Sequence, residues 1–285
     1  MQQKKISLVL GSGGARGIAH IGIIKWLEDH NYKIVSISGC SMGALIGGFY
    51  AAGRLDAYRE WLEELDMLDM FKLLDFQGSG GFVSGKKLML QLQEILGEHT
   101  IEDLLIKYTA VATDIDNQKE VWINKGPLID AIRASISLPL FFTPFNYKGK
   151  RLVDGGVLNP VPIAPTFHDS TDLTISVNLG GDPINYDPLQ KEKETKSLSQ
   201  TFQEYIKNIS LPDSLTKDGF YMIANNSFDT MQSSIAKMKL AAYPSDIEID
   251  IPVNLCGTFE FNKASALIEY GYNLCDSIEE LQENK

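Results

Sequence analysis

The chain has 285 residues, of which 44% are hydrophobic and 22% charged, and its formal net charge is -11 at pH 7. This composition is ordinary for a globular protein with a sizeable core, and the length allows one large α/β domain or two small ones. The negative charge repels phosphate backbones, so nucleic acid is excluded as a partner class. It also opposes contact with anionic membranes, except through apolar surface or a local basic patch.

The cysteines, histidines and apolar runs exclude disulfide-rich, zinc-binding, secreted and membrane-spanning proteins. The three cysteines, Cys40, Cys256 and Cys275, are too few and too scattered for a disulfide framework. No close pair of Cys or His residues indicates a zinc site. The apolar run 6–10 is too short for a signal-peptide core, and no window approaches the roughly 20 apolar residues of a membrane-spanning helix. We therefore expect a soluble, cytoplasmic protein of a reducing compartment.

The first fifty residues alternate strands and helices. Short apolar runs at 6–10 and 33–38 predict strands, and each is followed by a glycine-containing turn. Helices are predicted at 18–30 and 44–52. The order strand, turn, helix, repeated twice, is typical of a parallel sheet covered by helices.

The remaining pattern continues this alternation without a repeat or a linker, so we expect a single domain over 1–285. Further helices are predicted at 58–76, 88–96, 127–135, 198–210, 220–240 and 264–281, and further strands at 108–113, 120–123, 152–153, 173–178 and 247–253. The last strand alternates apolar and acidic residues, which predicts an edge or half-buried position. The stretch 180–197 is predicted as an exposed loop. The apolar residues 67–76, followed by glycines, form either a mobile cover over an acyl channel or ordinary core.

The strongest local signal is Gly39-Cys40-Ser41-Met42-Gly43, which matches the G-x-S-x-G pattern of a nucleophile elbow. A turn this sharp strains the backbone at the serine, and the flanking glycines leave room for it. Ser41 would present its hydroxyl at the N-terminus of the following helix, where the helix dipole favours developing negative charge. The alternative is that Ser41 only caps that helix.

The glycine-rich turn GSGGARG lets backbone N–H groups converge on one point, where they can bind phosphate or stabilise an oxyanion. A dinucleotide-binding turn requires glycine in place of Arg16, and a P-loop requires Lys and Ser or Thr after Gly17. Both patterns fail, which leaves an oxyanion hole. We assign to it Gly11, Ser12, Gly13, Gly14, Ala15, Arg16 and Gly17, together with Met42 beside the nucleophile. Arg16 either fixes the loop or helps to place an anionic head group.

A serine nucleophile requires a base, and two candidates remain. His168 is the one histidine that follows a candidate acid in the order Ser, Asp, His, but it lies in a predicted exposed turn. Asp154 ends a predicted strand and precedes two glycines, which places it at a ligand-facing edge of the sheet. Partial burial would raise its basicity. The alternative for Asp154 is a turn residue that caps its own backbone.

The segments GSGGARG, GCSMG and DGG together resemble the patatin-like phospholipase family, and specifically its small bacterial members. In that family a glycine-rich oxyanion loop, a G-x-S-x-G elbow and a D-G-[GA] motif follow in this order. Four further segments are similar: GIAHIGIIKWLE, VATDIDNQKEVWI, AIRASISLPLFFTPF and LVDGGVLNPVP. The likeness covers about residues 5–180, with a weaker echo at 259–272. Ser12 departs from the glycine of many members, and residues 182–250 show no likeness.

The resemblance implies a three-layer α/β/α sandwich with a mostly parallel central sheet. It implies Ser41 as nucleophile and Asp154 as base, in a dyad without histidine, metal or other cofactor. The substrates would be fatty acyl esters of phospholipids or simpler lipids, reached by transient, peripheral membrane contact. The alternative is a catalytically weak lipid-binding or regulatory protein on the same fold. The sequence leaves the oligomeric state, head group and acyl-chain preference open.

Overall fold

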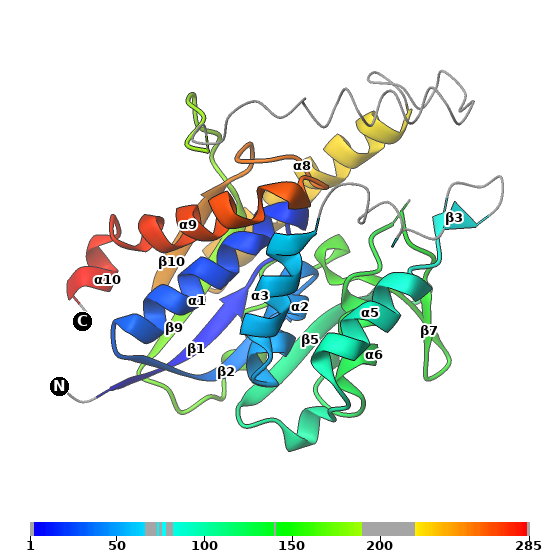
Figure 1. The fold of residues 1–285 in the computed structure, drawn as a ribbon, viewed down its shortest axis with the longest axis horizontal. Coiled ribbons are helices and arrows are strands. Elements are labelled where there is room, and N and C mark those ends of the chain that lie inside the picture. Colours follow the sequence, from blue (N-terminus) through cyan, green and yellow to red (C-terminus); the bar gives the residue numbers. More distant parts are fainter. Residues whose placement is uncertain are drawn as a thin grey trace.

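The computed structural model describes residues 3–65, 73, 76–77, 82–139, 141–189 and 220–283, arranged around one eight-stranded sheet (Figure 1). The strand order is β10-β9-β1-β2-β5-β8-β7, and β6 pairs with β5. The strands are β1 (Lys4–Leu10), β2 (Tyr32–Cys40), β5 (Lys107–Asp114), β6 (Lys119–Ile123), β7 (Phe145–Tyr147), β8 (Lys150–Asp154), β9 (Leu173–Gly181) and β10 (Ile247–Pro252). The run from β10 to β5 is parallel, whereas β6, β8 and β7 join it antiparallel. A separate hairpin pairs β3 (Phe76–Gln77) with β4 (Phe82–Val83).

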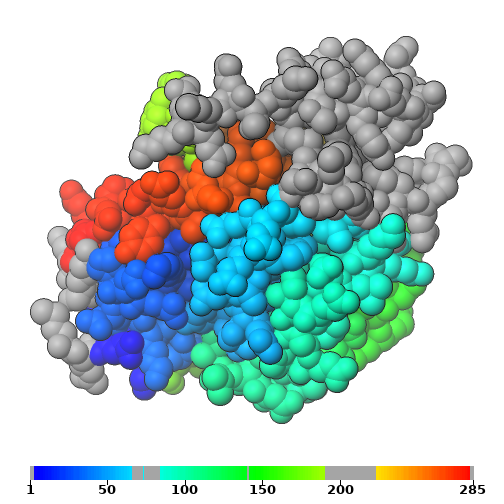
Figure 2. Space-filling model, in the orientation of Figure 1, coloured from blue at the N-terminus to red at the C-terminus, as the bar shows by residue number. Residues whose placement is uncertain are grey.

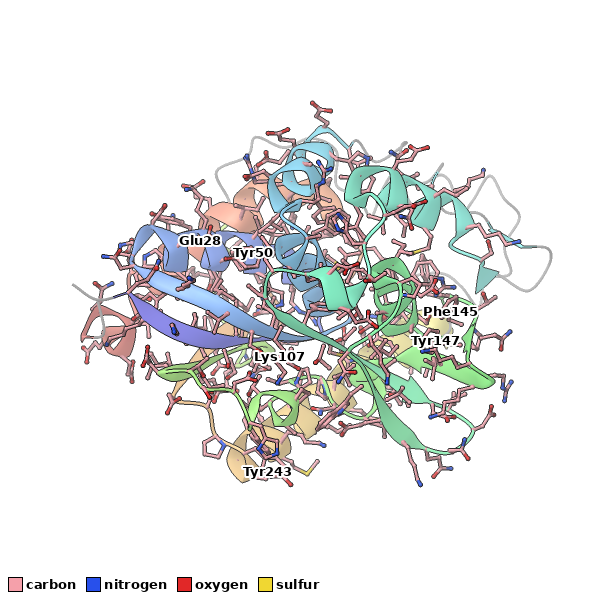
Figure 3. The ribbon with its side chains drawn as sticks, turned by 90° about the horizontal axis from the view of Figure 1, so that it is seen from below. Glu28, Tyr50, Lys107, Phe145, Tyr147 and Tyr243 are labelled. Carbon is pink, nitrogen blue, oxygen red and sulfur yellow. The ribbon has the colours of Figure 1, made fainter. Side chains whose placement is uncertain are left out.

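Helices cover both faces of the sheet. The described α-helices are α1 (Ala19–Asp29), α2 (Met42–Ala51), α3 (Leu55–Glu64), α5 (Lys86–Leu96), α6 (Leu128–Ser135), α8 (Phe220–Ala242), α9 (Ala264–Cys275) and α10 (Glu279–Glu283). In Figure 3, Glu28 of α1 and Tyr50 of α2 lie on one side of the sheet, and Tyr243, just after α8, lies on the other. The predicted three-layer α/β/α sandwich is therefore confirmed.

Burial explains the strand patterns. In β1, Ile6, Leu8 and Leu10 are fully buried, because helices cover both faces of a central parallel strand. In β10 the isoleucines are buried while Glu248 and Asp250 are exposed. This alternation belongs to a strand at the edge of the sheet, as the sequence predicted.

The strand order reverses at β1, which pairs with β2 on one side and with β9 on the other. In open α/β sheets, ligands bind outside the carboxyl ends of the strands at such a reversal, because the helices that follow leave to opposite faces. The glycine-rich loop follows β1 directly and contains the short 3₁₀-helix η1 (Gly14–Ile18). The fold therefore places this loop at the expected ligand-binding edge.

Two predicted helices are wrong in extent. The helix predicted at 58–76 is α3, which ends in extended backbone at Leu65, and Phe76 belongs to the β3–β4 hairpin. The helix predicted at 264–281 is broken into α9 and α10. At the break the indole of Trp26 donates to Asp276, and the hydroxyl of Ser277 donates to the carbonyl of Leu274, so side chains compete with the helical pattern. The predicted helix 198–210 lies outside the described residues, and so does almost all of the predicted cover 67–76. The single-domain boundary 1–285 remains a prediction.

The N-terminal and C-terminal segments lie side by side on the face shown in Figure 2, because α9 packs against α1. The two helices cross closely at two glycines. A Cβ on Gly22 would lie 1.9 Å from the carbonyl oxygen of Ile268, and one on Gly271 would lie 2.2 Å from that of Ala19. Backbone cannot yield as a flexible side chain does, so both positions require glycine.

We expect Gly22→Ala to lower the free energy of unfolding by about 1–3 kcal/mol, because the added methyl forces α1 and α9 apart. Urea unfolding followed by circular dichroism measures the change. Gly257→Ala is the control, since a Cβ there would lie 3.4 Å from its nearest neighbour, in the side chain of Glu260. Equal stability of the two variants would contradict the assigned helix crossing.

Candidate active site

Ser41 occupies a strained turn between β2 and α2. Its φ is 54° and its ψ is -122°, a backbone conformation that a residue with a side chain rarely adopts. The flanking glycines make the turn possible. A Cβ on Gly39 would lie 2.5 Å from the carbonyl oxygen of Gly43, and one on Gly43 would lie 2.0 Å from that of Leu10. The local geometry is that of the elbow predicted from the sequence.

Strand register brings Asp154 beside Ser41. On β5, Val111 pairs with Cys40 of β2 and the next residue, Ala112, pairs with Asp154 of β8. Ser41 follows Cys40, and its Oγ donates a hydrogen bond of 2.5 Å to Oδ2 of Asp154. The other carboxylate oxygen, Oδ1, accepts a 2.7 Å bond from the backbone N–H of Gly156. Two residues 113 positions apart thus form a direct pair.

Burial makes Asp154 a better base than an exposed carboxylate. Asp154 is fully buried and Ser41 is 8% exposed. Loss of hydration raises the pKa of Asp154 from 3.8 to about 6, against the opposing hydrogen bonds from Ser41, Gly156 and Cys40. The Cys40 thiol lies 3.8 Å from Oδ1, and burial followed by the charge of Asp154 raises its pKa well above the ordinary range. The carboxylate, rather than the thiol, is therefore the ionisable base beside Ser41.

The glycine loop leaves a few amides free. The N–H groups of Gly11, Ser12 and Ala15 donate to the carbonyls of Val177, Pro160 and Thr258, at 3.0, 2.8 and 2.9 Å. Arg16 and Gly17 lie within η1. Among the described residues, no acceptor meets the N–H groups of Gly13 and Gly14, nor that of Met42 at the start of α2.

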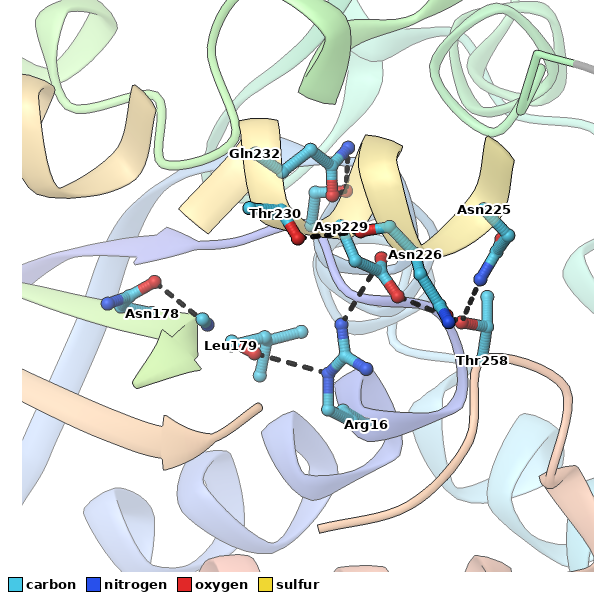
Figure 4. A network of polar contacts seen from close by, with 11 residues as sticks. Arg16, Asn178, Leu179, Asn225, Asn226, Asp229, Thr230, Gln232 and Thr258 are labelled. Carbon is cyan, nitrogen blue, oxygen red and sulfur yellow. Dashed lines mark hydrogen bonds and ion pairs between the residues drawn. The ribbon is translucent and has the colours of Figure 1, made fainter. Parts of the chain in front are cut away.

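The side chain of Arg16 extends toward Leu179 and Asp229 (Figure 4). This side chain is 5% exposed; Nε donates to the carbonyl of Leu179 at 3.2 Å, and Nη2 lies 3.6 Å from Oδ1 of Asp229 on α8. Of the two roles predicted for Arg16, these contacts favour fixing the loop.

Among the hydrogen bonds of the described residues, none joins a histidine to Ser41 or Asp154. His168 is exposed, and its neighbour Asp169 binds Lys107 at the start of β5, whereas Asp154 pairs near the end of that strand. His20 is buried, and its Nε2 donates to the carbonyl of Gly11 at 3.0 Å. Burial lowers the pKa of His20 to about 4, which keeps the ring neutral.

Sequence reasoning missed two buried contacts of the site. Ser135 accepts the N–H of Ser41 at 2.9 Å and donates to the carbonyl of Val111 at 2.6 Å, so it fixes the elbow against β5. Ser135 lies in one of the segments that carry the family resemblance, which was a usable signal. Gln232 of α8 contacts Ser12 in the glycine loop. It lies in 182–250, where the sequence offered no signal.

Comparison with known proteins identifies the family. The model of the patatin-like phospholipase family matches residues 8–167. The chain belongs to this family. An uncharacterized NTE family protein of Mycobacterium tuberculosis strain H37Rv is 34% identical over 94% of this chain and 89% of its own length. The solved structure of VipD from Legionella pneumophila shares the fold, with a TM-score of 0.50 and 16% identity over 99% of this chain and 67% of VipD.

Relatives with a named activity are longer proteins. The lysophospholipase NTE1 of Debaryomyces hansenii is 30% identical over 65% of this chain, but the match spans only 13% of the yeast protein. As a member of the patatin-like phospholipase family, the chain is an acyl ester hydrolase that acts on lipids. In the part of the chain that the structure describes, no helix is both long and apolar enough to cross a bilayer.

The raised pKa of Asp154 predicts a pH-dependent effect on stability. A carboxyl group with a folded-state pKa of about 6 contributes stability that is present below its unfolded pKa and lost as the pH rises through 6. Once Asp154 is ionised, this shift of about two pKa units lowers the free energy of unfolding by about 3 kcal/mol. We therefore expect Asp154→Asn to be more stable than the wild type above about pH 7, by up to about 3 kcal/mol, with the gap closing toward about pH 4.

Urea unfolding across this pH range measures the gap. Asp169→Asn is a control for which we expect the opposite effect. Burial raises the pKa of Asp169, but hydrogen bonds, led by the one from Lys107, outweigh burial and hold this pKa below its ordinary value. Removing the Asp169 carboxylate should therefore destabilise the protein at neutral pH. An Asp154→Asn gap that does not change with pH would show that Asp154 is not buried as described.

Proposed function

We propose that this chain hydrolyses fatty acyl esters of phospholipids and related lipids through a Ser41–Asp154 dyad. The observation that carries the proposal is the 2.5 Å hydrogen bond from Ser41 Oγ, on a strained elbow, to the buried carboxylate of Asp154. A nucleophile in hydrogen-bond contact with a base whose basicity is raised by burial is the arrangement that acyl transfer requires.

In the acylation step, Asp154 takes the proton of Ser41 while Oγ attacks the ester carbonyl. The carbonyl oxygen gains negative charge and accepts hydrogen bonds from the free amides of Gly13, Gly14 and Met42. Each well-placed donor of this kind contributes roughly 3–4 kcal/mol to the transition state. The carbon–oxygen bond of the ester then breaks, Asp154 returns its proton to the departing alcohol or lysolipid, and the acyl group stays on Ser41.

In the deacylation step, the same carboxylate removes a proton from a water molecule, which attacks the acyl-Ser41 ester. The same amides stabilise the second oxyanion, and Ser41 leaves as it regains its proton from Asp154. The fatty acid is released and the dyad returns to its starting state. One base therefore serves both steps, and the cycle consumes only ester and water.

The class of substrate rests on the relatives rather than on a cavity of this chain. Lysophospholipases of yeasts match part of the chain, which favours lysophospholipids and other single-chain esters among the substrates to test. Cytoplasmic location and transient membrane contact remain predictions from the sequence.

Ser41→Ala should abolish ester hydrolysis, and Asp154→Asn should lower kcat by several orders of magnitude, because each removes one half of the dyad. His168→Ala, a change at an exposed turn, should retain wild-type rates. Chromogenic esters of varied chain length, beside defined phospholipids and lysophospholipids, provide the assay. Loss of activity in His168→Ala with activity kept in Asp154→Asn would replace the dyad by a triad.

A fluorophosphonate probe separates an enzyme from a catalytically idle lipid-binding protein on the same fold. The wild type should become labelled at Ser41, and Ser41→Ala should not. Absence of labelling in a folded wild-type chain would favour the binding protein.

Arg16→Ala should lower kcat to a similar extent on phospholipids and on uncharged esters, because the guanidinium holds the loop through Leu179 and Asp229. Kinetics on one substrate of each kind make the comparison, and Lys239→Ala, a cation of α8 paired with Glu120, is the control for lost positive charge. A loss confined to the phospholipid, in KM, would instead assign Arg16 to head-group recognition.

A further inference from the structure

Helix α8 presents a polar stripe to the glycine loop. Asn225, Asp229 and Gln232 are spaced by four and three residues, so their side chains share one face of the helix. Asn225 donates to the hydroxyl of Thr258 at 3.3 Å, and that hydroxyl donates to Asp229 at 3.4 Å. The carbonyl of Thr258 accepts the N–H of Ala15. Figure 4 shows this stripe against the loop.

Two members of the stripe contact the residues on either side of Gly13 and Gly14, whose amides have no described acceptor. Gln232 Nε2 lies 3.2 Å from Ser12 Oγ, and Asp229 forms the ion pair with Arg16. Ser12 and Arg16 flank Gly13 and Gly14, which have no side chains of their own to fix them. The direction in which these two amides point therefore depends on contacts at either side of them.

Gln232 also lies against Gly156, in the turn that follows Asp154. A Cβ on Gly156 would be 2.0 Å from Nε2 of Gln232, 2.7 Å from Oγ of Ser12 and 3.0 Å from Oδ1 of Asp154. Gln232 is 6% exposed and Ser12 8% exposed. Gln232 of α8, Ser12 of the glycine loop and Gly156 in the turn after Asp154 therefore meet at one buried place.

We propose that Gln232 is a positioning residue of the acyl-transfer site, which through Ser12 orients the amides of Gly13 and Gly14 toward the oxyanion. This role rests on the proposed function. An amide turned out of line weakens a hydrogen bond that forms only as charge develops, so its loss lowers kcat and leaves KM nearly unchanged. Helix α8 is then part of the catalytic apparatus, although no catalytic motif lies on it.

The test is a double-mutant cycle with Gln232→Leu and Ser12→Ala on a neutral chromogenic ester. The concentration of active sites is counted by fluorophosphonate titration, so that partial unfolding does not enter kcat. Gln232→Leu should lower kcat per site by at least about tenfold with KM within about twofold. In the Ser12→Ala background the same change should cost less than about twofold, because the shared contact is already lost.

Ser234→Leu, on the exposed face of α8, is the control and should match the wild type. Should Gln232→Leu not fold, Gln232→Met replaces it, since its unbranched side chain fits the same space. The role of Gln232 would be overturned, and the proposed function would not, by either of two results. One is a wild-type kcat per site in the Gln232 variant, and the other is a double variant in which the two losses of kcat add fully. A wild type that neither hydrolyses ester nor reacts with the probe would overturn the proposed function and this role with it.

Discussion

The hydrogen bond between Ser41 and the buried carboxylate of Asp154 is the contact on which the arrangement of the site depends. It exists because β5 lies between β2 and β8 and sets their register, so that Cys40 and Asp154 pair with consecutive residues. A carboxylate in this position cannot be hydrated, and its pKa rises as a result. The same burial that costs the folded protein stability raises the basicity of the carboxylate beside Ser41.

The surroundings of the dyad are built from backbone rather than from charged side chains. Gly39 and Gly43 allow the elbow to approach β1, and two amides of the loop after β1 meet no acceptor within the described part of the chain. Backbone amides fixed before the reaction need no reorganisation as negative charge develops, which is why such sites stabilise an oxyanion well. Arg16 serves this arrangement by holding the loop through α8 and β9.

Helix α8, on the face of the sheet opposite to α1 and α2, contacts the glycine loop of the site. Its polar stripe reaches the glycine loop over a separation of 220 residues between Ser12 and Gln232. Next to Gln232 on the same face, Ala236 packs with Val9 and Val161 in a small apolar cluster. The helix is thus anchored by apolar packing on one turn and contacts the loop by hydrogen bonds on the turn before. Small movements of α8 would be transmitted to the loop, because close-packed elements cannot shift independently.

The sequence by itself determined seven of the eight strands of the main sheet, most helices and the elbow, because each depends on local demands. The choice of Asp154 over His168 as the base stays a prediction. Glycine is required where the backbone is strained or crowded, and apolar β-branched runs are required in a buried sheet. Only the tertiary structure decided the break between α9 and α10, the direction of Arg16, and the contacts of Ser135 and Gln232 with the site. These depend on partners distant in the chain, such as Trp26 for Asp276 and Asp229 for Arg16. No local pattern encodes them, since register and packing bring such residues together only after the sheet has formed.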